Sequence, residues 1–307
     1  MGTQIRRVVF IGSCSYSGST VLDMMLGRSE GNLSMGEIGR IFLPRSKEHF
    51  NRECGCLEKD CDFWSPLLQH GPVELHKRAF EEYGVSTLID STKDPHWIKD
   101  RTLELRKCGI DVVNLLIWKD PSSIRESFVK RGIEKKWKNS WVNYHRLYFS
   151  LVDEFHSLPF SALLEGGVSF SSRINAIGIK KINFEFWDYP GHTLFGNDSA
   201  KRHLHPVGTE EYKVIQARRE ESVSKEHDAF SHRQINHSEK SELIITNPLV
   251  EKIYQYLKDN DIANSSKGKT SLPPPELKMS RLSASIRRLH SISKTYMSYF
   301  KWGKKGK

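Results

Sequence analysis

A loop of small and hydroxyl-bearing residues near the amino terminus has the composition of an anion-binding loop. It follows the apolar run 8–11, precedes apolar residues at helical spacing, and consists of Ser15, Tyr16, Ser17, Gly18, Ser19 and Thr20. Small residues let the backbone approach a ligand closely, and amides at a helix N-terminus favour a phosphate. The lysine that nucleotide-hydrolysing loops carry before their Ser or Thr is absent. The sequence therefore predicts a phosphate loop that is not built for hydrolysis of nucleoside triphosphates.

A second strand-and-helix pair repeats this arrangement further along the chain. Residues 112–118 form a near-continuous apolar run, which is typical of a buried parallel strand. Lys119 ends the run, Pro121 suits the first turn of a helix, and Ser127 lies eight residues after Lys119. A cation at a strand end and a hydroxyl group in the next helix can converge on one anion. Two such sites on successive units predict a ligand with phosphates at both ends.

Both segments resemble motifs of the sulfotransferase family that uses 3′-phosphoadenosine 5′-phosphosulfate (PAPS). In that family a Ser-Gly loop with two further hydroxyl residues holds the 5′-phosphosulfate. An Arg-Asp-Pro segment, with a Ser eight residues after the Arg, holds the 3′-phosphate. Residues 17–20 and 119–127 match this spacing, and other segments similar to bacterial-type members follow in order at 36–37, 54–64, 90–93 and 192–198. The resemblance covers roughly residues 5–260. It implies PAPS as the donor, 3′-phosphoadenosine 5′-phosphate (PAP) as the product, and no metal.

Two residues depart from the family pattern. Tyr16 stands where many members carry Arg or Lys, and it keeps only a hydroxyl donor. Lys119 replaces the usual Arg, which keeps the positive charge but loses the bidentate guanidinium geometry. The resemblance still implies that the amides of Ser17–Thr20 hold the 5′ end of the donor, and that Lys119 and Ser127 hold its 3′-phosphate.

The resemblance also implies candidate catalytic residues. Glu37 matches a glutamate that several members use as a base, and sulfuryl transfer needs a base to deprotonate the acceptor hydroxyl. The alternative is a helix-terminal Glu without a chemical role. His192 is the rival base, with a structural role in its loop as the alternative. Lys93 is expected beside the donor, where it supplies charge that position 16 lacks; a solvated lysine at a helix cap is its alternative.

Three cysteines lie close together in a loop before residue 65. Cys54, Cys56 and Cys61 suggest a zinc site, but a structural zinc ion usually has four ligands, and the nearby sequence offers only His49 or His70 as a fourth. We therefore expect these thiols to pack the loop together with the aromatic residues that follow them. Cys14, in the predicted phosphate loop, is also assigned to packing.

Two other classes of function remain open. A kinase or nucleotide hydrolase on the same architecture needs the missing loop lysine and a Mg²⁺-binding aspartate. A non-catalytic module that binds adenosine bisphosphate is suggested by Tyr16, and donor binding without turnover would identify it. The acceptor cannot be read from the sequence, since hydroxyl groups of carbohydrates, lipids and small metabolites all fit the chemistry.

The alternation of predicted strands and helices indicates an α/β fold, in which a mainly parallel sheet has helices on both faces. This agrees with the P-loop-like sulfotransferase architecture that the resemblance implies. Ligands of such sheets bind at the carboxyl ends of the strands, where both predicted anion sites fall. The polar segment 196–241 is predicted to be a helical or mobile cover. The expected strands are 7–12, 32–36, 86–90 and 111–118, and the expected helices are 19–27, 73–83, 95–107, 121–132 and 137–157.

The formal net charge of +10 is concentrated at the carboxyl end. Residues 265–307 hold eleven Lys and Arg and one acidic residue, so residues 1–264 balance to zero. We therefore predict an α/β domain over 1–264 and a Pro/Ser linker with a basic amphipathic tail over 265–307, and we expect no nucleic-acid partner. The helical pattern of 277–307 favours contact with an anionic membrane. A solubilising tail and a helix docked on its own domain are the alternatives.

Composition favours a folded protein that works inside the cell. Hydrophobic residues make up 37% of the 307 residues, which allows a substantial core. No long apolar run opens the chain, so we expect neither a signal peptide nor a membrane anchor. Five cysteines, an odd number, favour a reducing cytosol. The expected location is cytoplasmic, with peripheral contact to the inner face of a membrane through the tail.

Overall fold

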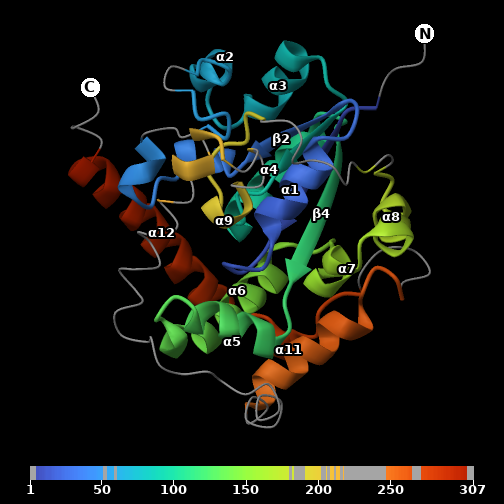
Figure 1. Ribbon diagram of the computed structural model, residues 1–307. Helices are drawn as coiled ribbons and strands as arrows, with labels where there is room; N and C mark the ends of the chain where they lie inside the picture. The colour runs from blue at the N-terminus through green and yellow to red at the C-terminus, as the bar shows by residue number, and fades with distance from the viewer. Residues whose placement is uncertain are drawn as a thin grey trace.

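The computed structural model has an α/β fold built on one parallel sheet (Figure 1). Its strands are β1 (Arg7–Gly12), β2 (Asn32–Gly36), β3 (Thr87–Asp90), β4 (Asp111–Trp118) and β5 (His156–Pro159), in the order β2-β3-β1-β4-β5. Every strand pair is parallel. The predicted α/β class is therefore confirmed. The structure describes residues 5–50, 54–58, 61–179, 182, 191–201, 205, 208–210, 212–214, 217, 247–264 and 271–302.

Side chains of β1 alternate between two apolar layers, one on each face of the sheet. Val8 and Phe10 join the cluster that includes residues of α3 (Leu75–Tyr83), α4 (Pro95–Lys107), α5 (Pro121–Val129), α6 (Trp137–Leu151) and α11 (Pro248–Asp259). Val9 and Ile11 join the cluster that includes residues of α1 (Ser19–Gly27), α7 (Phe160–Glu165) and α8 (Gly167–Ala176). All four of these side chains are fully buried. The sheet is thus covered by helices on both faces, as the continuous apolar strands predict.

The helices begin and end close to the positions that the sequence predicts. Asp94 and Asp120 cap two of them, because their carboxylates accept hydrogen bonds from amides of the first turn and a proline follows each. The helices are α1 (Ser19–Gly27), α2 (Ser65–Leu68), α3 (Leu75–Tyr83), α4 (Pro95–Lys107), α5 (Pro121–Val129), α6 (Trp137–Leu151), α7 (Phe160–Glu165), α8 (Gly167–Ala176), α9 (Asp198–Lys201), α11 (Pro248–Asp259) and α12 (Arg281–Trp302).

One predicted helix is too long. The expected helix 137–157 ends as α6 at Leu151, and Val152 already has extended backbone angles. The chain then enters β5, in which His156 pairs with Leu115 of β4. Apolar residues at Val152 and Phe155 continue the helical spacing, and the strand has only four residues, so its alternation is too short to be read from the sequence.

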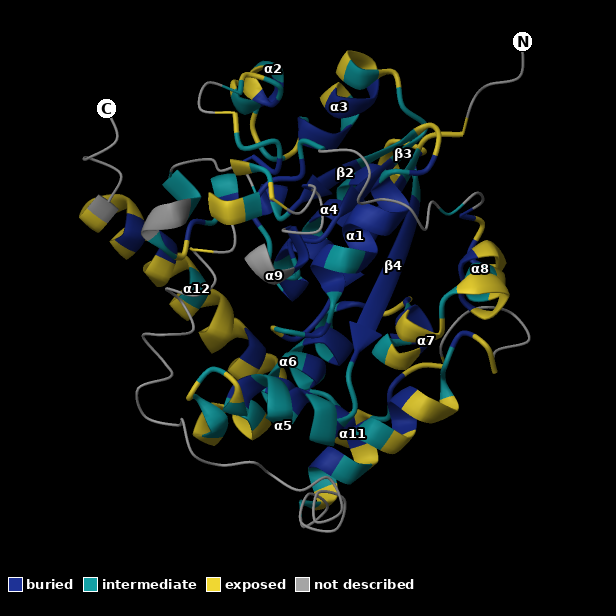
Figure 2. Ribbon diagram, in the orientation of Figure 1, coloured by how far each residue is buried: buried dark blue, intermediate teal, exposed yellow. Residues whose placement is uncertain are grey.

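The carboxyl-terminal helix α12 lies along one side of the domain (Figure 1). Arg288 forms an ion pair with Asp100 of α4 at 3.0 Å, and the Tyr299 hydroxyl donates a hydrogen bond to the carbonyl of Ile41. One side of the helix carries buried residues and the other is exposed (Figure 2). Among the described residues, no helix combines the length and hydropathy that crossing a membrane requires. Most of the predicted cover 196–241 lies outside the described residues.

Candidate functional site

The carboxyl ends of the strands present the predicted site residues at one edge of the sheet. Because all strands are parallel, the loops that follow them emerge on the same side. Ser13 follows β1, Glu37 follows β2, Lys93 comes three residues after β3, Lys119 follows β4 and Phe160 follows β5. The topology therefore collects hydroxyl, acidic, cationic and aromatic side chains from five separate segments.

The loop between β1 and α1 has the geometry of an anion-binding turn. Gly18 caps α1 in the left-handed conformation (φ 91°), and a Cβ there would lie 2.4 Å from the Phe160 ring. The hydroxyl groups of Ser13 and Ser17 are buried without a hydrogen-bond partner among the described residues. The first turn of a helix leaves its amides without partners inside the helix. Buried hydroxyls beside such amides indicate a place for a polar ligand.

The ring of Tyr16 places the guanidinium of Arg131 beside this loop, a contact that the sequence does not indicate. The backbone of Tyr16 is left-handed (φ 70°), and its ring packs edge-on against Phe128 at 5.2 Å. The Arg131 guanidinium lies over the same ring, 3.9 Å from its centre, and also donates a hydrogen bond of 2.6 Å to the Ser127 carbonyl. Sequence reasoning missed Arg131, because its proximity depends on how α5 packs against the loop and no motif marks it.

Lys119 and Ser127 lie close together at the end of β4 and on α5. The Lys119 ammonium lies 3.4 Å from the Ser127 hydroxyl and 4.3 Å from the centre of the Phe160 ring. They line a cavity of about 750 Å³. Burial lowers the pKa of Lys119, and the nearby Arg131 and Lys130 lower it further. A half-buried cation with two cationic neighbours is a favourable position for an anion.

Glu37 and Lys93 form an ion pair on the other side of the loop. The Lys93 ammonium lies 2.6 Å from Oε1 of Glu37, and Nε of Arg40 lies 3.3 Å from Oε2. Burial opposes ionisation of Glu37, but Lys93 and Arg40 outweigh it and hold the pKa of this carboxyl below its usual range. Lys93 itself has a left-handed backbone (φ 66°), and its carbonyl accepts a hydrogen bond from the Tyr144 hydroxyl.

A cavity of about 850 Å³ joins the phosphate loop to this ion pair. Ser13, Cys14 and Ser15 of the loop line it together with Glu37 and Lys93. Helix α12 contributes a further part of the wall with basic side chains at positions 287, 294 and 301. Lys119 and Ser127 do not line this cavity but the separate one described above. Ser15, Glu37 and Lys93 therefore line one cavity, and Lys119 and Ser127 line another.

Asp90, at the end of β3, serves a structural purpose. Its Oδ2 accepts hydrogen bonds from Trp97 Nε1 at 2.9 Å and lies 3.0 Å from His76 Nε2. Its Oδ1 accepts from both the amide and the hydroxyl of Thr92. Both carboxylate oxygens are thus occupied within the protein, which leaves the residue no oxygen for a metal ion.

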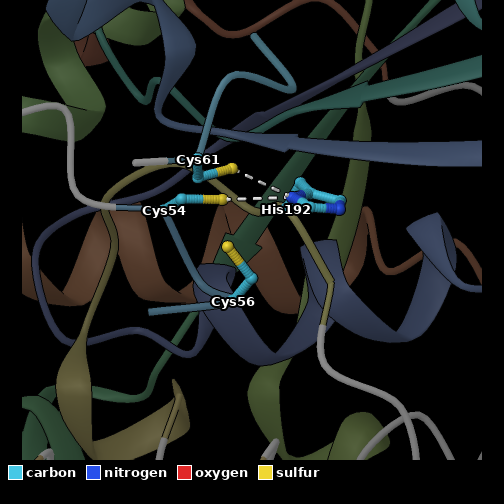
Figure 3. Close-up of side chains that lie close together, drawn as sticks. All are labelled: Cys54, Cys56, Cys61 and His192. Carbon is cyan, nitrogen blue, oxygen red and sulfur yellow. Dashed lines mark hydrogen bonds between the residues drawn. The ribbon is translucent and has the colours of Figure 1, made fainter. Parts of the chain in front are cut away.

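The prediction that no metal is involved is contradicted by a four-residue cluster. Cys54, Cys56, Cys61 and His192 place one ligand atom each within 4.8 Å of one another (Figure 3). His192 Nδ1 lies 3.5 Å from the sulfur of Cys54 and 3.4 Å from that of Cys61. Packing by thiols and aromatic rings is therefore an incomplete account of the cysteine loop, since the arrangement offers a complete ligand set for zinc.

Burial shifts the pKa values of the ionisable groups in the cluster. It raises the pKa of the Cys54 and Cys56 thiols, which favours the neutral thiols, whereas a metal ion binds the thiolates. Burial lowers the pKa of His192, which favours the neutral imidazole that binds metals. The cysteine spacing was visible in the sequence, but the fourth ligand comes from a segment more than a hundred residues away, and no local pattern connects the two.

Comparison of the chain with protein-family models, curated proteins and solved structures gives no match. What is established is therefore the α/β fold with its five-stranded parallel sheet.

Proposed function

We propose that this protein is a sulfotransferase that moves a sulfuryl group from PAPS to an acceptor hydroxyl. The observation that carries the proposal is the shared cavity that residues 13–15, where the predicted phosphate loop begins, line together with Glu37 and Lys93. An anion-binding loop beside a carboxylate and an ammonium supplies a donor site, a base and a stabilising charge within one space. The motif resemblance supports the assignment of PAPS as the donor.

The loop and Lys93 hold the phosphosulfate in this proposal. Amides at the start of α1 and the buried Ser17 hydroxyl bind the 5′ end, while Lys119 and Ser127 bind the 3′-phosphate. As the S–O bond to the donor breaks, negative charge grows on the bridging oxygen. Donors that are already oriented toward that oxygen stabilise the transition state.

Glu37 serves as the base. It is paired with Lys93, and the lowered pKa makes it a weak proton acceptor. A bound phosphosulfate competes for the Lys93 ammonium. Loss of that pairing raises the basicity of Glu37 when the acceptor hydroxyl must lose its proton. Donor binding and base activation are thus linked through one lysine.

The geometry favours this function over a kinase or nucleotide hydrolase. Such an enzyme needs a carboxylate free to hold Mg²⁺ near the phosphates. Asp90 is the acidic residue at the end of β3, and four protein hydrogen-bond contacts occupy its carboxylate. The loop lysine is also missing.

The acceptor enters the larger cavity and carries negative charge. Around Glu37 the wall is mainly basic: its Lys and Arg residues are Arg40, Arg45, Lys93, Arg287, Lys294 and Lys301, against the carboxylates of Glu37 and Asp94. Such a wall favours an acidic carbohydrate, lipid or metabolite over a neutral alcohol, because its cations outnumber its carboxylates.

The test is transfer of label from radiolabelled PAPS to molecules in an extract of the source cell, separated by anion exchange. We expect a labelled product whose unlabelled precursor already binds the exchanger. The control is Glu37→Gln protein, which should bind PAP and label the product about 10²–10⁴-fold more slowly. If wild-type protein binds PAP but labels no fraction, the binding-module alternative replaces the enzyme.

A further inference from the structure

We propose that Cys54, Cys56, Cys61 and His192 bind one structural Zn²⁺ ion, which fixes the segments that position Glu37 and the start of α1. Metal binding follows from the cluster itself, whereas the positioning of a base rests on the proposed function. The site lies on the sheet edge beyond β2, where the cysteine loop and residues 191–197 run side by side.

The geometry of the cluster fits a tetrahedral ion. Zn–S bonds of about 2.3 Å and Zn–N bonds of about 2.0 Å place ligand atoms about 3.5–3.8 Å apart in a tetrahedron. The two S···N distances to His192 are 3.5 and 3.4 Å, and all four ligand atoms lie within 4.8 Å of one another. All three sulfurs point toward the space beside the imidazole (Figure 3). Four protein ligands leave no open position for substrate, which is the pattern of a structural site.

The surroundings of His192 fix its orientation. The Phe63 ring is stacked on the imidazole, with ring centres 3.9 Å apart and planes 2° from parallel. Trp64 Nε1 donates a hydrogen bond to the His192 carbonyl at 2.5 Å. Residues that orient a ligand commonly accompany protein metal sites, and both of these directly follow the cysteine loop in the chain.

The residues after His192 connect the cluster to the catalytic side. The Thr193 carbonyl accepts from the amide of Gly55, and the Thr193 hydroxyl lies 2.7 Å from that of Ser34 in β2. The Leu194 carbonyl then accepts a 2.9 Å hydrogen bond from the amide of Glu37. A metal that holds His192 therefore restrains the backbone that holds Glu37.

The same segment reaches the phosphate loop. The Asn197 amide donates to the Thr20 hydroxyl at 3.2 Å, in the first turn of α1. Gly36 allows the close approach on the other side: its backbone is left-handed (φ 63°), and a Cβ there would lie 2.0 Å from the Leu194 carbonyl oxygen. A single ion thus ties the cysteine loop, the end of β2 and α1 together through residues 192–197.

Metal analysis of the purified full-length chain tests the binding. We expect one zinc per chain by mass spectrometry, and a cobalt-substituted protein with the thiolate charge-transfer and intense visible bands of a tetrahedral site. Cys56→Ser should lower zinc content at least tenfold. Cys108→Ser is the matched control, because Cys108 is exposed and outside the cluster, and it should keep full zinc. The proposal is overturned if the purified protein is folded but contains no zinc. It is also overturned if protein purified under reducing conditions has a disulfide within the cluster.

Two substitutions of His192 distinguish a role as zinc ligand from a role as general base. His192→Cys keeps a ligand but removes the imidazole, and we expect it to retain zinc and most of the transfer rate. His192→Ala should lose both zinc and transfer. Loss of transfer in zinc-loaded His192→Cys protein contradicts the positioning role and makes His192 a base. Zinc binding by wild-type protein that transfers no sulfuryl group contradicts only the proposed function.

Discussion

The ammonium of Lys93 lies 2.6 Å from the carboxylate of Glu37, although the two residues come from the ends of different strands. Both side chains are largely buried, so the pair has little solvent to screen it. The arrangement keeps Glu37 ionised and at the same time weakens it as a base. Any ligand that attracts Lys93 therefore changes the chemistry available to Glu37.

Replacement of Glu37 by Gln tests its role as the base. The amide keeps the shape of the side chain and cannot accept the proton, so transfer should slow about 10²–10⁴-fold while PAP affinity stays within a few-fold of wild type. Steady-state rates with saturating donor, together with calorimetry, measure the two effects. Unchanged turnover with an unchanged pH profile would make Glu37 structural.

Replacement of Lys93 by Met should move the pH profile. Lys93 lowers the pKa of Glu37 against the effect of burial, so its removal raises that pKa, and the acidic limb of kcat/KM shifts to higher pH. The maximal rate should also fall about 10²-fold, because a donor to the developing charge is lost. Arg78→Met, which removes an exposed ion pair with Glu81, is the control. If the acidic limb does not move, Lys93 does not control the pKa of the catalytic base.

Asp23 makes stability depend on pH. Burial raises the pKa of its carboxyl to about 8, despite a hydrogen bond donated by Ser91. Unfolding then releases a proton between about pH 4 and this value, so stability falls as pH rises across that window, by up to ~1.4 kcal/mol per pH unit. In Asp23→Asn protein this contribution should vanish. Urea unfolding at several pH values compares the slopes, and equal slopes contradict the buried neutral acid.

We propose that the exposed apolar side of α12 contacts an anionic membrane. Leu289 and Phe300 are 67% and 74% exposed. Leu289→Glu combined with Phe300→Glu should lower binding to anionic liposomes at least tenfold, since burying such a side chain contributes about 1.5–3 kcal/mol. Leu164→Glu is the matched control, because Leu164 is 73% exposed on α7. Equal co-sedimentation of all three proteins leaves this face without a membrane role.

The parts of the fold that sequence periodicity determines were predictable. The apolar runs of β1 and β4, and the Asp-Pro starts of α4 and α5, mark their own boundaries. The pairing of Lys119 with Ser127 also follows from spacing, because both lie on one strand-and-helix unit. These features depend on contacts close in sequence.

The features that were missed depend on distant segments. His192 joins the cysteines only because residues 192–197 run beside the cysteine loop and the end of β2. Arg131 reaches the predicted phosphate loop through the Tyr16 ring. The sequence shows that the tail is basic, but it does not show that Arg287 and Lys294 of the tail line the same cavity as Glu37. Each relationship arises from tertiary packing.

Calorimetric titration with PAP tests the central claim most directly, because PAP carries both phosphates and needs no acceptor. We expect wild-type protein to bind PAP at least thirtyfold more tightly than ADP, which lacks the 3′-phosphate. Lys119→Ala and Ser127→Ala should each weaken PAP binding about thirty- to a hundredfold, as expected when a charge-assisted hydrogen bond of roughly 2–3 kcal/mol is lost. Ser122→Ala, on the same helix, should change it little. Equal affinity for PAP and ADP, or no effect of either substitution, would contradict the account.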